Sequence, residues 1–249
     1  MLGIGGGAIM VPLLIILMRV PIRYAIGTSL AVIVLVICVG LGAQVVLHPG
    51  DIHWDVALLL TAGSIGGSFA GKWLNKVLPE SLLVYAFAVL LLVVAVRLFG
   101  VLPDMRPVMG EMPDFGDGGN LSFLLAVGVL AGVASSLFGL GGGIVVVPAL
   151  ALGYGFFHDE FTATRATSLA MVLPTSLIGA ILHWRAGNVD RAMVTRTTPL
   201  ALVAAVGGVL LAYAVHPGAL KVLFGVLMII AAARLVLHRP GRERPAKNI

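Results

Sequence analysis

The chain has 249 residues, of which 59% are hydrophobic and 11% are charged. Soluble domains usually carry about 25% charged residues, and the mean hydropathy here is +1.08. These values exclude a soluble globular enzyme and a disordered chain, and the single cysteine, Cys38, excludes a disulfide scaffold. The net charge of +5 does not indicate nucleic-acid binding, because much of it lies in the tail at residues 239–249. The sequence therefore indicates a membrane protein with several crossings.

Six apolar runs approach or exceed the roughly 20 residues that a helix needs to cross a hydrocarbon core. In the second run, Gly63, Gly67 and Gly71 predict close helix packing. Lys72 and Lys76 lie near the end of that run, where we expect them to reach the membrane interface. The six predicted transmembrane helices are residues 25–47, 56–78, 82–99, 166–184, 197–215 and 219–237.

One further apolar run, residues 121–157, is too long for a single crossing. As one helix it would measure about 55 Å, nearly twice the hydrocarbon core. Gly139-Leu140-Gly141-Gly142-Gly143 interrupts it, and glycine-rich segments are poor helix formers. We therefore expect two arms, residues 121–138 and 144–157, with a break between them.

The N-terminus repeats the second half of this pattern, with Gly3-Ile4-Gly5-Gly6-Gly7 followed by an apolar run at residues 8–18. No counterpart of the first arm precedes this cluster. A lone arm would leave glycine-rich backbone facing lipid. We therefore expect the functional protein to begin upstream of Met1, or this chain to be impaired.

The two glycine clusters open an internal repeat. We accordingly predict a first repeat at residues 1–100, an external linker at 101–120, a second repeat at 121–238 and a basic cytoplasmic tail at 239–249. Further matches in the same order are Pro12 with Pro148, Thr28-Ser29-Leu30-Ala31 with Thr167-Ser168-Leu169-Ala170, Gly50-Asp51-Ile52 with Gly187-Asn188-Val189, Gly66-Gly67 with Gly207-Gly208, and Arg97-Leu98 with Arg234-Leu235.

Basic loops and loops without Lys or Arg alternate along each repeat, and loops at equivalent positions in the two repeats differ in positive charge. In the first repeat, residues 19–23 and 72–76 are basic and the loop at 48–55 has no Lys or Arg. In the second, the loop at 157–164 has none and the stretch at 185–196 has three. By the positive-inside rule, equivalent loops fall on opposite sides. The sequence thus predicts an all-α membrane protein of two inverted repeats, each a glycine-broken re-entrant hairpin plus three transmembrane helices, with a cytoplasmic C-terminus.

These paired motifs resemble the TauE/SafE family of sulfite and organosulfonate exporters. The resemblance rests on the Gly-x-Gly-Gly-Gly clusters with proline five residues later, the Thr-Ser-Leu-Ala helix starts and the Gly-Asn-Val-Asp loop at residues 187–190, and it covers residues 2–237. It implies a duplicated helical bundle that moves small sulfur-containing anions across the plasma membrane, in bacteria the inner membrane. The chain departs from the family by lacking the first arm before Gly3.

The glycine clusters are the first candidate site. A helix that restarts inside the membrane presents unpaired N–H groups and a positive dipole end, which can hold an anion without a charged side chain. Two such ends facing each other would form a midplane site; the alternative is that the glycines only permit tight packing. The predicted site residues are Gly5, Gly6, Gly7, Gly141, Gly142 and Gly143.

Polar side chains in the following helices extend this candidate site. The matched hydroxyls could donate to a sulfonyl oxygen, or could cap or back-bond their helices. Three further polar residues could contact substrate or could be ordinary residues of the membrane interface. They are Gln44 and His183, which occupy matched positions in the repeat, and Arg165, which lies beside the second Thr-Ser pair. We expect no Lys or Arg deep enough to contact the anion. The four hydroxyl residues are Thr28, Ser29, Thr167 and Ser168.

The sequence predicts neither an enzyme nor a cofactor. No Asp or Glu lies within an apolar run, and there is no P-loop, metal-ligand cluster or nucleophile constellation. Two functions are considered: a permease or exporter for a small anion, and a non-transporting membrane scaffold or assembly factor. The expected partners are a small sulfur-containing anion and membrane lipid but no nucleic acid, and a homodimer is left open.

Overall fold

The computed structural model describes residues 6–18, 20–99, 118–154, 161–214 and 217–237. The described elements are all helical, with one short 3-10 turn, η1, at Pro49–Asp51. Most of the predicted linker, the whole predicted tail and Gly3 to Gly5 lie outside the described residues. The helices are α1 (Gly7–Met18), α2 (Ile22–Leu47), α3 (Trp54–Val77), α4 (Glu80–Leu98), α5 (Gly118–Phe138), α6 (Gly143–Tyr154), α7 (Phe161–Arg185), α8 (Arg191–Ala214) and α9 (Pro217–Leu237).

Each apolar run of the sequence forms a helix, so the all-α prediction is confirmed. The predicted break also lies where expected, since α5 ends at Phe138 and α6 begins at Gly143. Helices α7 and α8 begin five and six residues earlier than predicted, because their polar first turns interrupt the apolar signal.

Three helices within the described residues are long and apolar enough to cross a membrane: Ile22–Val46, Asn120–Phe138 and Ala163–Arg185. The second of these is α5, one arm of the predicted hairpin. The two arms are therefore unequal: α5 has 21 residues and the length of a full crossing, whereas the 12 residues of α6 extend only about 18 Å.

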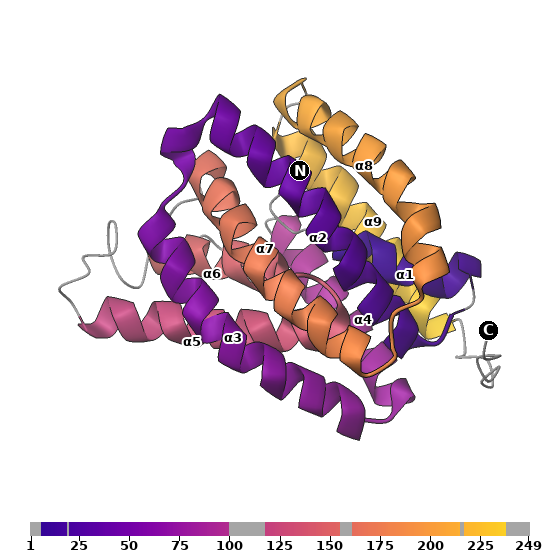
Figure 1. The fold of residues 1–249 in the computed structure, drawn as a ribbon. Helices are drawn as coiled ribbons and strands as arrows, with labels where there is room; N and C mark the ends of the chain where they lie inside the picture. The colour runs from indigo at the N-terminus through magenta and orange to yellow at the C-terminus, as the bar shows by residue number, and fades with distance from the viewer. Residues whose placement is uncertain (1–5, 19, 100–117, 155–160, 215–216, 238–249) are drawn as a thin grey trace.

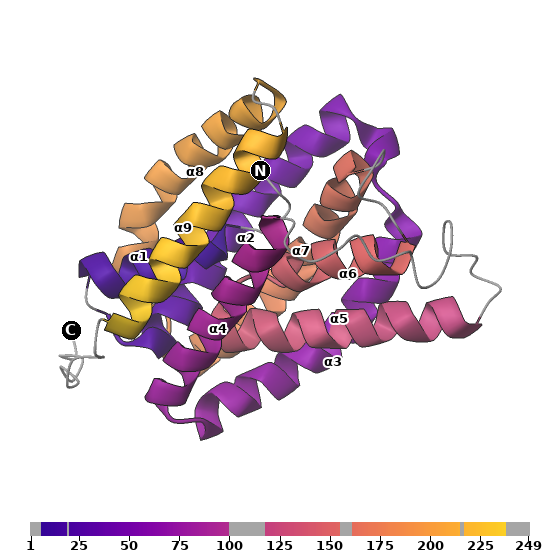
Figure 2. The ribbon, with the colours of Figure 1, turned by 180° about the vertical axis from the view of Figure 1, so that it is seen from behind.

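Helices α2 and α7 pack against each other in the middle of the bundle (Figures 1 and 2). Helix α3 packs on α7 and is flanked by α5, whereas α8 packs on α2 from the other side. Helices α1 and α4 both pack on α9. A large apolar cluster fills the space among α1, α2, α4 and the end of α5, where Phe87 stacks on Phe138 with ring centroids 5.5 Å apart.

The glycine face predicted on α3 packs against the backbone of α5. A Cβ atom added at Gly63, Gly67 or Gly71 would overlap the carbonyl oxygen of Leu125, Val129 or Val133, respectively. The contact is reciprocal, because α5 presents Gly128 and Gly132 to the carbonyls of Leu60 and Ser64. Such close approach is typical of small-residue interfaces between membrane helices. It fixes α5, and with it the glycine break at its end.

Candidate functional site

The second glycine break adopts a backbone conformation that strongly favours glycine. Gly139, Gly141 and Gly142 have φ angles of +75°, +77° and +89°, in the left-handed region that other residues rarely adopt. The first turn of α6 closes when the amides of Val145 and Val146 donate to the carbonyl of Gly142, at 3.0 and 3.2 Å. The preceding amides have no carbonyl partner in their own helix. The break therefore offers N–H groups at a positive helix end.

The first glycine break has the same form. Gly6 has a φ of +74°, and its carbonyl accepts hydrogen bonds from the amides of Ile9 and Met10 at 3.2 and 3.1 Å. Gly7 starts α1 and packs so tightly on the second break that a Cβ atom there would overlap the carbonyl oxygen of Gly139. The two breaks are therefore in contact at Gly7, while Gly5 lies outside the described residues.

The four predicted hydroxyl residues are all buried, with exposed fractions of 0% for Thr28, Ser29 and Ser168 and 2% for Thr167. Ser29 Oγ donates to the carbonyl of Gly139 at 3.1 Å, so it holds the second break from the first repeat. As this proton is already used, Ser29 is a positioning residue in the present arrangement. Whether the four residues contact substrate stays a prediction.

The two threonines bind loops of the opposite half in a reciprocal way. Thr28 Oγ1 accepts a hydrogen bond from the amide of Asp190 at 3.2 Å. Thr167 Oγ1 accepts one from the amide of His53 at 3.1 Å. His53 and Asp190 occupy matching places in the two Gly-x-x-x loops of the repeat. The loop of each half thus binds a threonine on the opposite half: the loop at Asp190 binds α2, and the loop at His53 binds α7.

The other three predicted polar residues lie near helix ends, Gln44 at the end of α2, Arg165 at the start of α7 and His183 at the end of α7. Gln44, 7% exposed, donates through Nε2 to Asp51 Oδ2 at 3.4 Å, at the end of α2. Arg165 is partly buried near the start of α7. His183 is fully buried near the end of α7, where its Nε2 contacts the carbonyl of Ser136 at 2.9 Å. Gln44 and His183 are both buried, and whether either contacts substrate stays a prediction.

Lys72 lies closer to the break than the sequence indicated. Its Nζ is 3.3 Å from Nδ1 of His183. Because a carbonyl oxygen only accepts hydrogen bonds, the Ser136 contact requires the proton on Nε2, which leaves Nδ1 to accept from the Lys72 ammonium. One histidine therefore connects Lys72 to the last turn of α5, three residues before Gly139. The Lys72 side chain is partly buried and turns toward α7 at this point. That no Lys or Arg contacts the anion stays a prediction.

Sequence reasoning missed four buried serines on α3, α5 and α7. Ser135 and Ser136 precede the second break on α5, Ser176 lies on α7 and Ser68 on α3, and their side chains are 0% exposed. Among the described residues their Oγ atoms have no hydrogen-bond partner. A Cβ atom added at Gly141 would lie 2.8 Å from Ser176 Oγ, which places this hydroxyl directly against the break. The adjacent pair Ser135-Ser136 was the available sequence signal.

The site therefore consists of neutral donors, and Lys72 is linked to it through His183 and Ser136. Backbone N–H groups and hydroxyls can replace the hydration of an anion, and none of them is itself charged. Unpartnered buried hydroxyls are costly, so a site that leaves them unpaired within the chain suits a ligand that accepts hydrogen bonds.

Comparison with known proteins is consistent with this chemistry. The family model described as "Sulfite exporter TauE/SafE" matches residues 1–98 and 124–249. The probable membrane transporter protein YunE of Bacillus subtilis is 26% identical over 210 residues, which cover 76% of this chain and 74% of that protein. YdhB of the same organism, also named a probable membrane transporter, is 26% identical over 78% of this chain and 77% of its own length. A probable membrane transporter of Methanocaldococcus jannaschii is 25% identical, covering 76% and 67%. No solved structure matches the chain significantly.

Proposed function

The chain belongs to the TauE/SafE family of membrane transporters, and from this premise we propose that it is a permease for a small sulfur-containing oxyanion, sulfite or an organosulfonate. The anion binds where the two glycine breaks meet, beside Gly7 and Gly139. The protein acts in the plasma membrane, which in a bacterium is the inner membrane. The named substrate comes from the description of the matching family, since the curated relatives are named only as probable transporters.

The observation that carries the proposal is the gathering of uncharged hydrogen-bond donors at one buried place. Helix α6 begins there, α1 begins beside it, and the unpaired hydroxyl of Ser176 lies against Gly141. Ser135 and Ser136, whose hydroxyls are also unpaired, lie in the last turn of α5 just before the break. Neutral donors bind an oxyanion without leaving a buried unpaired charge when it departs. Transport needs such moderate binding, because release matters as much as capture.

Two inverted repeats would place this site between halves that face opposite sides of the membrane. The reciprocal bonds of Thr28 to Asp190 and of Thr167 to His53 support this arrangement, since the same matched residues interact in both directions. In this proposal the stretch at residues 185–196 and the C-terminal tail are cytoplasmic, and the loop at 48–55 faces outward.

Anion flux in proteoliposomes tests the function directly. Purified protein should carry labelled sulfite or taurine faster than empty liposomes, and comparison with sulfate and thiosulfate defines its selectivity. A pH gradient across the membrane shows whether protons are coupled to the flux. No flux of any of these anions by correctly inserted protein would favour the scaffold function instead.

Substitutions at the break test the site. Ser176→Ala removes a hydroxyl that lies against Gly141, and should lower the rate of flux while the protein inserts and folds normally. Thr195→Ala is the matched control, because its hydroxyl only back-bonds to Ala192 on the exposed side of α8. Gly142→Val should abolish flux, since it adds bulk at a φ of +89° and 3.1 Å from the carbonyl of Ala131. Wild-type flux in both site variants would place the anion elsewhere.

Cysteine labelling tests the inverted orientation. In a Cys38→Ala background, Asp51→Cys and Asn188→Cys place one thiol in each of the matched loops. A membrane-impermeant reagent should label the first from outside intact cells and the second only after permeabilisation. Labelling of both from the same side would show that the repeats are parallel.

A further inference from the structure

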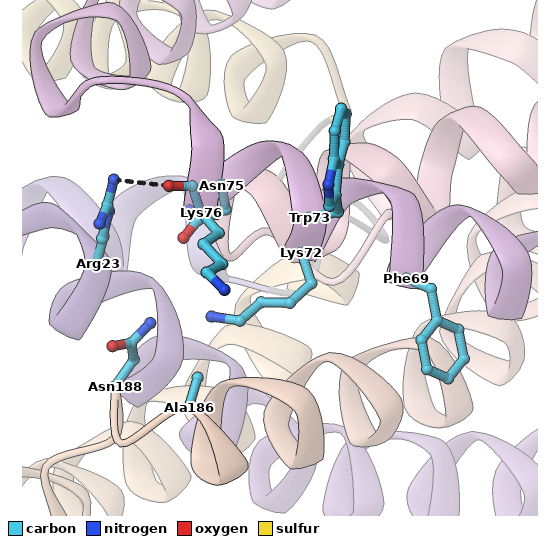
Figure 3. Close-up of a pocket in the computed structure, with 8 residues that line it drawn as sticks. All are labelled: Arg23, Phe69, Lys72, Trp73, Asn75, Lys76, Ala186 and Asn188. Atoms are coloured by element: carbon cyan, nitrogen blue, oxygen red, sulfur yellow. Dashed lines mark hydrogen bonds between the residues drawn. The ribbon is translucent and has the colours of Figure 1, made fainter.

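A pocket with a volume of about 420 Å³ lies at the end of α3, where the start of α2 and the loop after α7 come together (Figure 3). It is separate from the glycine breaks and was not among the predicted sites. Its described lining residues are Arg23, Phe69, Lys72, Trp73, Asn75, Lys76, Ala186 and Asn188.

The charge of this pocket is entirely positive among its described lining residues. Lys72 and Lys76 extend from successive turns of α3 into the same space, and Arg23, in the first turn of α2, lines the pocket beside the end of α3 (Figure 3). Like charges repel when they converge, and the repulsion strengthens in a partly dehydrated site. A bound anion would remove this repulsion, so the geometry favours an anionic occupant.

The acidic residue nearest in sequence, Asp190, already has a role. Its Oδ1 accepts a hydrogen bond from the amide of Met193 at 3.1 Å, so it caps the start of α8. Its own amide donates to Thr28. The carboxylate is thereby committed to the first turn of α8, whose positive dipole end it complements.

Hydrogen bonds from the surrounding residues hold the pocket in shape. Arg23 Nη2 donates to the carbonyl of Leu78 at 2.9 Å and to that of Lys76 at 3.4 Å, so it caps the end of α3. Asn75 Nδ2 donates to the carbonyl of Leu137 on α5 at 3.1 Å. Arg23 Nε is buried and has no partner among the described residues. Arg23 Nε is thus the guanidinium donor that the described residues leave unused.

The pocket is linked to the glycine break through a single side chain. Lys72 donates to His183, which in turn donates to Ser136 near the end of α5. An anion in the pocket would compete with His183 for the Lys72 ammonium. An anion bound in the pocket would therefore alter the hydrogen bonds of His183 at Ser136, three residues before Gly139.

We propose that this pocket is a second binding site for an oxyanion group of the sulfite, sulfonate or phosphate class, held by Lys72, Lys76 and Arg23. The identity of its occupant rests on the proposed function, under which the transported anion is captured here before it reaches the glycine breaks. The proposed orientation puts the pocket on the cytoplasmic side, where an exporter meets its substrate. The phosphate of a membrane lipid has the same chemistry, and Trp73 and Phe69 on the pocket rim are 64% and 56% exposed.

The fluorescence of Trp73 reports occupancy of this pocket alone. The chain has three tryptophans, so a Trp54→Phe/Trp184→Phe background leaves Trp73 as the only indole. Purified protein in nanodiscs of neutral phosphatidylcholine is titrated with sulfite and with methanesulfonate. We expect a saturable fluorescence change that Lys72→Gln/Lys76→Gln weakens by about tenfold or more for the two cations removed. Arg196→Gln/Arg234→Gln removes two exposed cations elsewhere and should leave the titration unchanged.

The lipid arm uses nanodiscs that contain phosphatidylglycerol. If neither sulfite nor methanesulfonate changes the fluorescence in neutral discs, but phosphatidylglycerol does so and Lys72→Gln/Lys76→Gln removes the effect, the oxyanion site stands with a lipid as its occupant. Titrations that are unchanged by Lys72→Gln/Lys76→Gln, or the absence of any response to either source, overturn the proposal.

The two proposals fail separately. Gly142→Val should stop flux and leave the Trp73 titration intact, because it alters the break and not the pocket. Wild-type protein that transports no anion but binds sulfite at Trp73 would refute the proposed function and keep the pocket. Wild-type flux with no fluorescence response of Trp73 in either type of nanodisc would support the proposed function and refute the pocket.

Discussion

Gly6 and Gly142 occupy matching places in the two glycine breaks, one residue before α1 and α6, and they differ in what surrounds them. Both have a positive φ, +74° and +89°. A Cβ atom at Gly142 would lie 3.1 Å from the carbonyl of Ala131 on α5, whereas one at Gly6 would meet no described atom within 4 Å. The glycine sequence therefore determines the backbone conformation of both breaks. The packing of α5 determines how deeply the second break is buried.

The largest effect is expected from separating α5 from α3, which would make the second break resemble the first. Gly67→Val should lower the free energy of unfolding by about 3 kcal/mol, because its Cβ would overlap the carbonyl of Val129. Gly66→Val is the matched control, since the neighbouring glycine faces open space. Thermal unfolding in detergent measures both. Equal destabilisation by the two variants would contradict close packing of α5 on this face.

A smaller effect is expected from alanine at the two matched glycines. Gly6→Ala and Gly142→Ala should each destabilise the protein by about 1–2 kcal/mol, because both place a side chain at positive φ. Gly142→Ala should cost roughly 1 kcal/mol more, since it also crowds the Ala131 carbonyl. Chemical denaturation of the two variants gives the difference. The reverse order would mean that α5 does not constrain the second break.

The smallest effect is expected where the two halves are alike. Thr28→Val and Thr167→Val each remove one hydrogen bond between a central helix and the opposite loop. Each should destabilise the protein by about 1 kcal/mol, and the two losses should be similar. Denaturation of the single variants against wild type provides the measurement, with Thr195→Val as the exposed control. A loss at only one position would show that the two loops are not equivalent in energy.

The helices and the glycine break could be predicted from sequence because their causes are local. Twenty apolar residues in a row have few alternatives to a helix, and Gly141-Gly142-Gly143 interrupts one wherever it occurs. The close-packed face on α3 could also be predicted from the spacing of Gly63, Gly67 and Gly71. Its partner could not, because α5 lies far along the chain and nothing in α3 specifies which helix will cover it.

The polar contacts of the site were less predictable because they depend on tertiary packing. The sequence does not distinguish a lysine near the end of a helix that extends outward to the interface from one that, like Lys72, turns inward to a histidine. Thr28 and Thr167 could be matched from the repeat, but their binding to Asp190 and His53 follows from how α2 and α7 cross. The unpaired buried serines come from three different helices, and it is Ser176 of α7 whose hydroxyl lies against Gly141.

The pairing of α3 with α5 also has a consequence for how the protein is made. The last residue of α5 is synthesised about 60 residues after the last residue of α3. At about 5–20 residues per second, α3 waits roughly 3–12 seconds for the helix that covers its glycines. During that interval its glycine face is left without the helix that covers it in the folded protein. Assembly of the second break therefore begins with a helix that is synthesised before its partner exists.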